Sequence, residues 1–537
     1  MEPEERVVRT EGAPPAYHTS DDEGLLHRLG YAQELFRAMG GFRNFAISFT
    51  IISILAGCLT SYNIGFEHGG PMWVVYGWLL VGLMATIISL SMAEIASAYP
   101  TAGGLYYWAS KLGSPGWGWA TGWFNLIGQV AVTAAIGYGL ALFGQALFDF
   151  WFSYSAHMED WFGATFDAST YILYALFLTA AALINLLNIR LTSGLNMISA
   201  WWHMIFVLVI VAILIIVPND HQSVSYVFTE TVNNSGYGGS TTSFGLAFLL
   251  VLGLGMLLPQ YTITGFDASA HTAEETRGAS IAAAQGVWRS VFWSAVIGWF
   301  VLLALLFAAT DVNGVNDAGG ASNSIVTSAL SGDMWAAKMI LIIVTVGQLF
   351  CGAAGLTSAS RTWYAFSRDR GMPGWWLFRR LNRDKVPLYA VMAVSVAALI
   401  ITIPALWSTA AAPTFPWAFF AIVGICTVGL YIAYTIPVYL RLRRGASFEV
   451  GPWNLGRHYR WINPTAIVWV ILTVIIFCLP YGPASVPWFD EFDAPALNYT
   501  PMVLVVGAIV AIWWLVSAKN RYTGPVRTLE EDEVTRG

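Results

Sequence analysis

Twelve long apolar stretches recur along the chain, and they limit its possible folds more than any other feature. A helix needs about 20 mostly apolar residues to cross the hydrocarbon core of a bilayer. Because 56% of the 537 residues are hydrophobic and only 11% are charged, the composition suits lipid better than water. We therefore expect an all-α integral membrane protein with twelve transmembrane helices near residues 45–65, 72–95, 118–147, 171–189, 198–217, 244–266, 291–309, 334–356, 388–407, 417–440, 464–479 and 502–518.

Lysine and arginine are concentrated in every second connection between the expected spans, and such residues are retained on the cytoplasmic side of inserted helices. The basic clusters SRDRGMPGWWLFRRLNRDK and RLRRGASFEVGPWNLGRHYR lie on one side, whereas the opposite connections contain neither residue. The acidic start of the chain lacks the apolar core of a signal peptide. We expect a multi-pass plasma-membrane protein with both termini cytoplasmic. Its expected parts are a disordered tail (1–30), spans one to five (31–218), spans six to ten (219–444), spans eleven and twelve (445–519) and a second tail (520–537).

Motifs for catalysis or metal binding are missing from the sequence. There is no HExxH, GxSxG or Walker loop, and all four cysteines lie in apolar stretches, where they are expected as small buried residues. A channel needs a polar stripe along one helix, and none is visible. We expect neither an enzyme nor a nucleic-acid-binding protein, and no cofactor. The expected partners are lipid, a small-molecule substrate and possible coupling protons, with the oligomeric state open.

Two of the apolar stretches are interrupted by small or polar residues. The first contains SILAGCLTSYNIG, with Gly57 near its middle, and the sixth contains GFDAS at residues 265–269. The sixth span comes five spans after the first, as in an inverted repeat of five spans, so that the two interrupted helices meet head to tail near the midplane. Close helix packing is the commoner use of a single membrane glycine, and it is the alternative at Gly57 and Gly265.

Several ordered motifs resemble one family of membrane proteins. GGPMWVVYGWLLVGLMATIISLSMAEIASAYPTAGGLYYWASKL, GFDASAHTAEET and SASRTWYAFSRDRGMP resemble the second, sixth and eighth helices of the amino acid–polyamine–organocation superfamily. GWFNLIGQVAVTAAI and YTIPVYLRLRR are most similar to its amino acid/choline transporter subfamily, which includes γ-aminobutyrate permeases. The resemblance covers about residues 30–520 and departs at Leu55-Ala56-Gly57, where the superfamily usually has GSG.

The resemblance implies a five-plus-five inverted repeat with broken helices 1 and 6, and uptake or exchange of amino acids or related amines such as γ-aminobutyrate. Alternating access with proton coupling or exchange is the expected mechanism. A choline or polyamine carrier of the same fold is the alternative, and it would need an anionic or aromatic cage rather than two free backbone ends.

A zwitterionic substrate needs a partner for each of its two charges. The restarting half of the first helix offers backbone N–H groups for a carboxylate, and the end of the first half of the sixth helix offers carbonyls for an ammonium. We therefore expect substrate binding by Ala56, Gly57, Cys58, Leu59, Thr262, Thr264, Gly265 and Phe266, with Gln129 as a further ligand candidate. Phe266 would close over the ligand or pack in the core. Gln348 is expected to form hydrogen bonds between helices, which is also the commoner role for Gln129.

Four titratable residues are candidates for proton coupling or gating. His203 lies where many superfamily relatives carry a lysine, and Glu94 is expected to pair with an arginine at the inner end of the second span. Asp267 follows the break directly, where burial would hold a carboxylate partly protonated, or its oxygen would cap the restarting half-helix. His271, one turn on, would exchange a proton with it. We expect Glu274 and Glu275 farther inward, hydrated and near Arg277.

Overall fold

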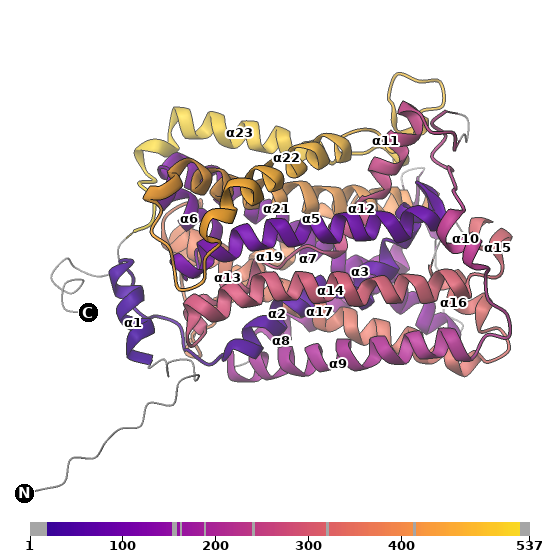
Figure 1. Ribbon diagram of the computed structural model, residues 1–537, viewed down its shortest axis with the longest axis horizontal. Helices are drawn as coiled ribbons and strands as arrows, with labels where there is room; N and C mark the ends of the chain where they lie inside the picture. The colour runs from indigo at the N-terminus through magenta and orange to yellow at the C-terminus, as the bar shows by residue number, and fades with distance from the viewer. Residues whose placement is uncertain are drawn as a thin grey trace, which may run out of the picture.

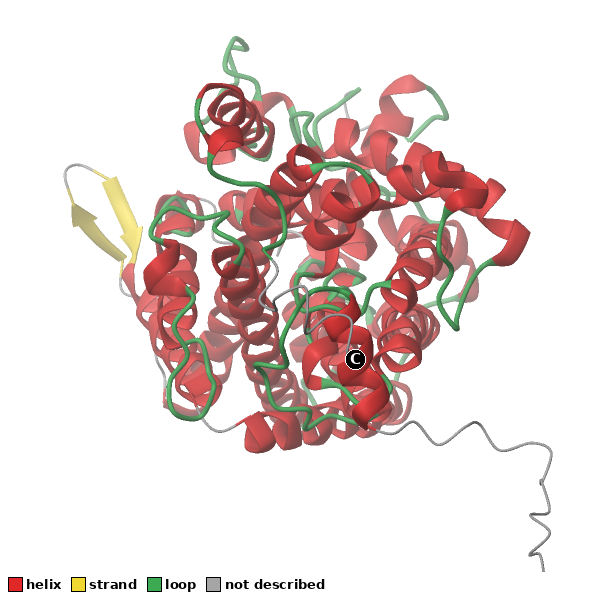
Figure 2. Ribbon diagram, turned by 90° about the vertical axis from the view of Figure 1, so that its left-hand side faces the viewer, coloured by secondary structure: helices red, strands yellow, loops and turns green. Residues whose placement is uncertain are grey.

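The computed structural model describes residues 19–152, 158–161, 164–186, 189–238, 242–317, 322–411 and 415–526. Long helices run side by side along one direction, with both ends of the described chain at the same end of the bundle (Figure 1). Figure 2 looks along the bundle and shows many helices end-on. The only strands in the described ranges form one hairpin, β1 (Met158–Trp161) with β2 (Ala164–Asp167), so the expected all-α fold is confirmed apart from this small addition.

Nine helical segments in the described ranges are long and apolar enough to cross a membrane, and three shorter apolar helices occupy the remaining expected stretches. The count of twelve spans therefore stays a prediction. The helices of the first half are α2 (Gly41–Ile52), α3 (Ile54–Thr60), α4 (Tyr62–Glu67), α5 (Gly70–Ala98), α6 (Gly104–Leu112), α7 (Pro115–Phe152), α8 (Ala168–Leu186) and α9 (Ile189–Ile216).

The second half contains α10 (Val224–Thr229), α11 (Leu246–Gly255), α12 (Leu257–Thr262), α13 (Ala268–His271), a 3-10 turn (Ala273–Glu275), α14 (Ala279–Ala308), α15 (Val312–Asp317), α16 (Ser322–Ala329), α17 (Met334–Arg368), α18 (Trp375–Phe378), α19 (Leu388–Ile401), α20 (Ala405–Ala411) and α21 (Trp417–Arg444). The chain continues with α22 (Tyr459–Phe477) and α23 (Met502–Val516). Both the first and the sixth expected spans are divided into short helices, as an interrupted helix requires.

The two divided spans lie antiparallel and in direct contact. Early in α2, the Asn44 amide donates to the Ser269 carbonyl over 2.8 Å, and one turn later the Ser48 hydroxyl donates to the Phe266 carbonyl over 2.9 Å. Farther along, Gly57 packs against Thr262. Residue numbers in the sixth span therefore decrease along these contacts as residue numbers in the first span increase. This head-to-tail contact fits the inverted relationship expected between the first and sixth spans.

Parts of the two segments expected as tails make contacts with the bundle in the described part of the chain. Thr19–Arg28 form helix α1, and Asp22 in it accepts from the backbone N–H groups of Gly278 and Ala279 over 2.7 and 3.2 Å. Asp22 therefore caps the start of α14. Near the other end, the Val526 N–H donates to Asp369 over 3.2 Å. The remaining tail residues, 1–18 and 527–537, lie outside the described part.

Candidate functional site

The first divided span breaks at Ser53, four residues before the expected position at Gly57. Ser53 has φ 32° and ψ 78°, in the left-handed region that a residue with a side chain rarely occupies. Its hydroxyl oxygen accepts the Ala56 N–H over 3.2 Å and lies 2.8 Å from His203 Nε2. Its carbonyl accepts from the Ala56 and Gly57 N–H groups over 2.9 and 2.8 Å. Ser53 therefore caps α3, and the amides of Ala56 and Gly57 are engaged in this conformation.

The sixth span breaks between Ile263 and Asp267, where the sequence predicts it. Gly265 has φ 87°, and a methyl group built on it would lie 2.3 Å from Ile51 Cγ2. Both the backbone conformation and the approach of the first span therefore require glycine here. The Tyr431 hydroxyl donates to the Ile263 carbonyl over 2.8 Å, and the Gly265 N–H donates to the Tyr434 hydroxyl over 3.3 Å. Helix α21 thus holds the opened backbone.

A small cavity lies between the two breaks. It is lined by Ile51, Ile52, Ser53, Ala56, Gly57, Val132, Ile136, Tyr261, Thr262, Thr264 and Cys351. Four of the expected substrate residues, Ala56, Gly57, Thr262 and Thr264, are in this lining. Every lining residue is uncharged. Sequence reasoning missed Ser53, Tyr261 and Cys351, since a serine, a tyrosine and a cysteine in apolar spans carry no distinctive pattern.

The other expected substrate residues lie outside this lining. Cys58 and Leu59 are fully buried in α3. Phe266 is also fully buried, with its ring 4.8 Å from that of Tyr434, which matches the core-packing alternative for this side chain. Gln129 from α7 donates to Asp267 over 2.8 Å. In this conformation Gln129 therefore contacts the expected proton-coupling group.

Asp267 is fully buried, and its carboxyl group contacts polar side chains from three elements. Its Oδ1 accepts the Tyr434 hydroxyl over 2.7 Å, while Oδ2 lies 2.8 Å from Gln129 Nε2 and 3.0 Å from His271 Nε2. Its side chain makes no capping bond to α13. The capping alternative is therefore wrong, because the carboxyl group turns away from the restarting helix towards α7 and α21.

His271 joins this carboxyl group to the connection before α6. Its Nδ1 lies 3.1 Å from the Ala102 carbonyl, and its Nε2 faces both Asp267 and the Asn125 amide, 3.1 Å away. Since a carbonyl only accepts, Nδ1 carries a proton. A lone pair on Nε2 would then face a carboxylate lone pair at 3.0 Å unless one further proton sits between them. The pair is thus either His271⁺ with Asp267⁻, or a neutral histidine with a protonated carboxyl group.

His203 is bonded differently. Its Nδ1 lies 2.8 Å from the Ser199 carbonyl one turn earlier, and its Nε2 lies 2.8 Å from the Ser53 hydroxyl. With Nδ1 donating, a neutral Nε2 accepts the Ser53 proton, and both ring nitrogens are satisfied. The Ser53 oxygen remains free to accept the Ala56 N–H. His203 therefore fastens α9 to the break of the first span without needing a charge.

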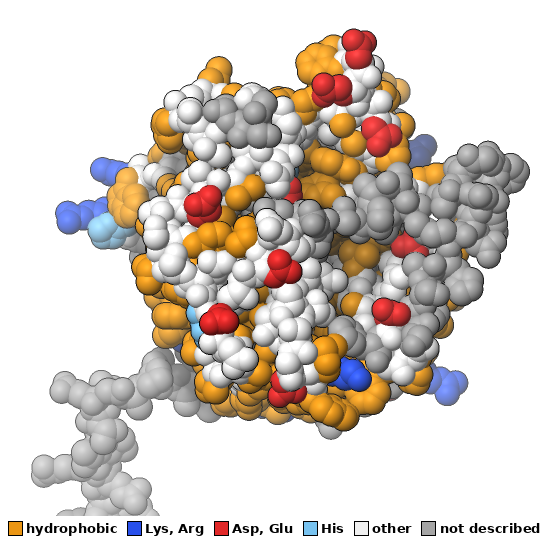
Figure 3. Space-filling model, turned by 90° about the vertical axis from the view of Figure 1, so that its right-hand side faces the viewer, with side chains coloured by type: hydrophobic (Ala, Val, Ile, Leu, Met, Phe, Trp, Pro, Cys, Tyr) orange, Lys and Arg blue, Asp and Glu red, His pale blue; other side chains and the backbone are white. Residues whose placement is uncertain are grey.

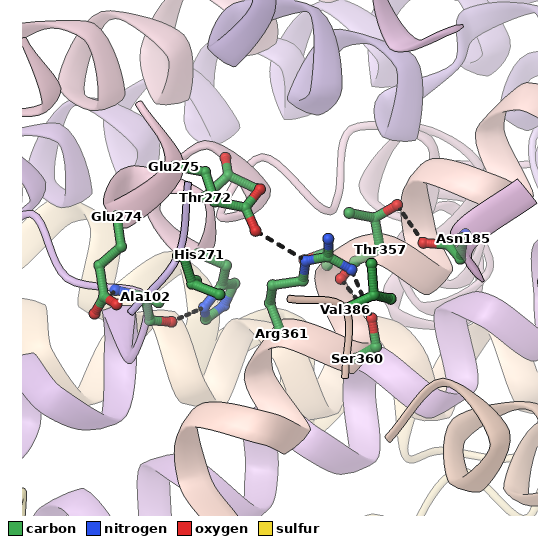
Figure 4. A network of polar contacts seen from close by, with 12 residues as sticks. Ala102, Asn185, His271, Thr272, Glu274, Glu275, Thr357, Ser360, Arg361 and Val386 are labelled. Carbon is green, nitrogen blue, oxygen red and sulfur yellow. Dashed lines mark hydrogen bonds and ion pairs between the residues drawn. The ribbon is translucent and has the colours of Figure 1, made fainter. Parts of the chain in front are cut away.

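Buried ion pairs lie at the end of the bundle that carries the chain termini, and Figure 4 shows one of them, between Glu275 and Arg361. Glu274 pairs with Arg368 at 3.2 Å and accepts the Ala102 N–H over 2.9 Å, and Glu275 pairs with Arg361 at 3.3 Å. Both carboxylates are at most 2% exposed. The expected hydrated pair near Arg277 is therefore wrong, because α17 supplies two arginines to groups that the sequence places beside a third.

Two more acidic residues tie this end together. Glu94 pairs with Arg441 at 2.8 Å, which confirms the arginine partner expected for it. Asp369 accepts the hydroxyls of Tyr31 and Tyr106, each over 2.9 Å. Burial raises the pKa of Asp369 to about 6, against the opposing effect of Arg368.

Taken together, an apolar helical bundle with two antiparallel, interrupted helices around a small cavity defines the class as a membrane transporter rather than an enzyme. Comparison with known proteins specifies it further. The family model described as amino acid permease matches residues 39–510, and the chain belongs to this family. It is accordingly a membrane protein that transports amino acids.

Several curated relatives resemble the chain over nearly its whole length. It is 37% identical over 522 residues to amino-acid permease BAT1 of Arabidopsis thaliana, covering 94% of this chain and 96% of that one. It is 36% identical to the amino-acid permease BAT1 homolog of Oryza sativa subsp. japonica, covering 94% and 95%. A more distant relative, the GABA-specific permease of Saccharomyces cerevisiae, is 26% identical, covering 96% and 87%.

Proposed function

We propose that this permease couples amino acid uptake across the plasma membrane to proton entry by alternating access. The substrate occupies the cavity between the two breaks, against the backbone of α3 and the Thr262–Thr264 segment. The coupling proton resides between Asp267 and His271. The observation that carries the proposal is the 3.0 Å contact between two buried titratable groups, Nε2 of His271 and Oδ2 of Asp267.

Tyr434 links the proton to the break. Its hydroxyl donates to Asp267 over 2.7 Å and accepts the Gly265 N–H over 3.3 Å. A change in the charge of Asp267 alters the strength of the Tyr434 hydrogen bond, because bonds to an ionised acceptor are roughly twice as strong as neutral ones. The sixth span opens at Gly265. Loss or gain of one proton by Asp267 therefore changes a hydrogen bond of Tyr434, which also contacts the backbone at the break between the two halves of this span.

His203 has a gating role in this proposal. It holds Ser53 in its left-handed conformation and so fixes the angle between α2 and α3. It does not carry the coupling proton, since its two ring nitrogens are satisfied by Ser199 and Ser53 in the neutral form.

The character of the cavity favours an amino acid over choline or a polyamine. Tyr261 is the one aromatic residue in the lining, and the lining contains no carboxylate. A cation without a carboxylate is recognised by an aromatic or anionic cage, which this cavity does not provide. γ-Aminobutyrate, named in the description of the yeast relative, stays a candidate among the amino acids.

The charges at the two ends support the orientation with both termini in the cytoplasm. The end opposite the termini shows scattered Asp and Glu side chains, with Lys and Arg mainly at its rim (Figure 3). The buried arginines Arg361, Arg368 and Arg441 all lie at the terminus-bearing end. Because cytoplasmic connections of membrane proteins carry an excess of Lys and Arg, this difference between the two ends supports a cytoplasmic position for the termini.

The test is uptake of labelled amino acids into proteoliposomes, with and without an inward proton gradient. Asp267→Asn keeps the shape and the bond from Tyr434 but cannot ionise. We expect it to lose gradient stimulation while retaining exchange of substrate for substrate. Asp333→Asn, at an exposed helix cap, is the matched control and should behave as wild type. A wild-type pH profile in Asp267→Asn would place the coupling proton elsewhere.

A further inference from the structure

Gln348 in α17 is fully buried, yet neither atom of its side-chain amide has a hydrogen-bond partner within the described part of the chain. Leaving a buried donor and acceptor unpaired is costly, and native proteins rarely do so without a ligand or water for them. From the sequence, interhelical hydrogen bonding is the commoner expected role of both Gln129 and Gln348, and Gln129 is the better ligand candidate of the two. The structure reverses this ranking, since Gln129 is bonded to Asp267 and Gln348 is unpaired.

Three helices place Gln348 one turn beyond the cavity. On α17, Cys351 lines the cavity, and Gln348 lies three residues before it on the same face. On α7, Ile136 lines the cavity, and Gly139 lies three residues after it. On α3, Ala56 lines the cavity, and the hydroxyl of Thr60 donates to its carbonyl over 2.8 Å. Each of the three helices therefore contributes to the cavity lining and to the next layer.

The residues of this next layer meet one another. A methyl group built on Gly139 would lie 3.0 Å from Thr60 Cγ2 and 3.7 Å from Gln348 Oε1. Since α17 runs towards the ion-paired end and reaches Arg368 there, Gln348 lies on the side of the cavity away from the Glu274–Arg368 pair. The open amide thus stands next to the cavity, at its side away from the termini.

We propose that Gln348 is a specificity-determining residue that binds the far end of the substrate's side chain, and that it favours amino acids ending in a carboxamide, such as glutamine. The inference rests on the proposed function of the cavity. A carboxamide satisfies both free atoms at once, donating to Oε1 and accepting from Nε2.

Other side-chain ends fit this position less well. A carboxylate satisfies only Nε2, and an ammonium satisfies only Oε1. Either one also brings a charge next to a cavity whose lining has none, which is expensive to bury. An aliphatic end leaves both atoms of Gln348 unpaired. Sites built to hydrogen-bond a polar group reject analogues that lack it.

The experiment measures kcat/KM for uptake of labelled glutamine, leucine, glutamate and γ-aminobutyrate into proteoliposomes. Gln348→Leu removes the amide at similar volume, and Gln348→Glu keeps an acceptor but removes the donor. We expect glutamine uptake by Gln348→Leu to fall by about 10- to 100-fold while leucine uptake is retained or increased. In Gln348→Glu, the ratio of glutamine to leucine uptake should fall by less than in Gln348→Leu.

Asn463→Leu is the matched control. Asn463 is another fully buried amide with both atoms unpaired within the described part of the chain, but it lies on α22, a helix with no residue in the cavity lining. It should leave the ratio of glutamine to leucine uptake unchanged. An unchanged ratio in both Gln348 variants would show that Gln348 merely packs or holds water, and would overturn the inference. If the wild-type protein transports none of the four amino acids, the proposed function itself fails.

Discussion

The contact between Gly57 and Thr262 gives a quantitative test of the cavity. A methyl group built on Gly57 would lie 2.6, 2.7 and 2.8 Å from Cγ2, Oγ1 and Cβ of Thr262. Carbon atoms normally stay about 3.5–4.0 Å apart, so Gly57→Ala must separate the two interrupted helices by about 1 Å. Thr262 cannot rotate away freely, because it is β-branched and its hydroxyl is bonded to the Leu258 carbonyl over 2.8 Å.

Overpacking of this kind costs about 1–3 kcal/mol. If the cost falls on the conformation in which the two breaks close around the substrate, the population of that conformation drops about 5- to 150-fold. We expect the initial rate of amino acid uptake in proteoliposomes to fall by the same factor in Gly57→Ala, and uptake to be blocked in Gly57→Val. Both variants should still insert and purify in normal amounts.

Two further variants identify the cause. Gly57→Ala/Thr262→Gly removes all three clashing atoms and should recover much of the lost uptake. Gly352→Ala is the matched control, since its methyl group would meet Ile136 Cγ2 at an ordinary 3.6 Å. Uptake by Gly57→Ala at the wild-type rate would refute the assignment of this contact to the transport cycle. So would a double variant that stays inactive while Thr262→Gly alone is active.

Two other predictions concern the terminus-bearing end. Glu94→Gln leaves the nearly buried Arg441 without its charge partner, so we expect a loss of about 3–5 kcal/mol in stability, seen as a lower midpoint of thermal unfolding in detergent. Exposed Glu449→Gln should change it little, and equal midpoints for Glu94→Gln and wild type would contradict the burial argument. Burial raises the pKa of Asp369 from 3.8 to about 6, so the native carboxyl keeps a proton that the unfolded one releases. The free energy of unfolding should therefore decrease by about 3 kcal/mol as the pH rises from about 4 to 6. Asp369→Asn should remove this decrease and exposed Asp384→Asn should not; an unchanged pH dependence in Asp369→Asn would refute the assignment.

The apolar pattern predicted the helices well because each span must satisfy its own backbone in lipid, which makes the signal local. The break at Gly265 was also predictable, since the run GFDAS places an aspartate two positions after a glycine in an otherwise apolar stretch. The break at Ser53 was not. Its hydroxyl contacts His203, which lies 150 positions away, and no local pattern predicts that contact.

The polar partners were harder to predict than the breaks. Gln129 and Gln348 have similar sequence surroundings, and only the packing of α7 and α17 decides which of them meets Asp267. From the sequence, Glu274 and Glu275 are expected at the hydrated boundary beside Arg277. In the fold, Arg368 and Arg361 of α17 pair with them instead. The sequence specifies which groups need partners, whereas the tertiary contacts specify which partners they find.

The cap that Asp22 places on α14 has a consequence for synthesis. Asp22 and the Gly278 N–H that it accepts are separated by 256 positions. At 5–20 residues per second, a ribosome needs on the order of 10–50 s to make the intervening chain. During that time Asp22 has no native partner at this position, because the start of α14 has not yet been made. The contact between α1 and α14 therefore forms only after the seventh span has been made, although α1 is made among the first described residues.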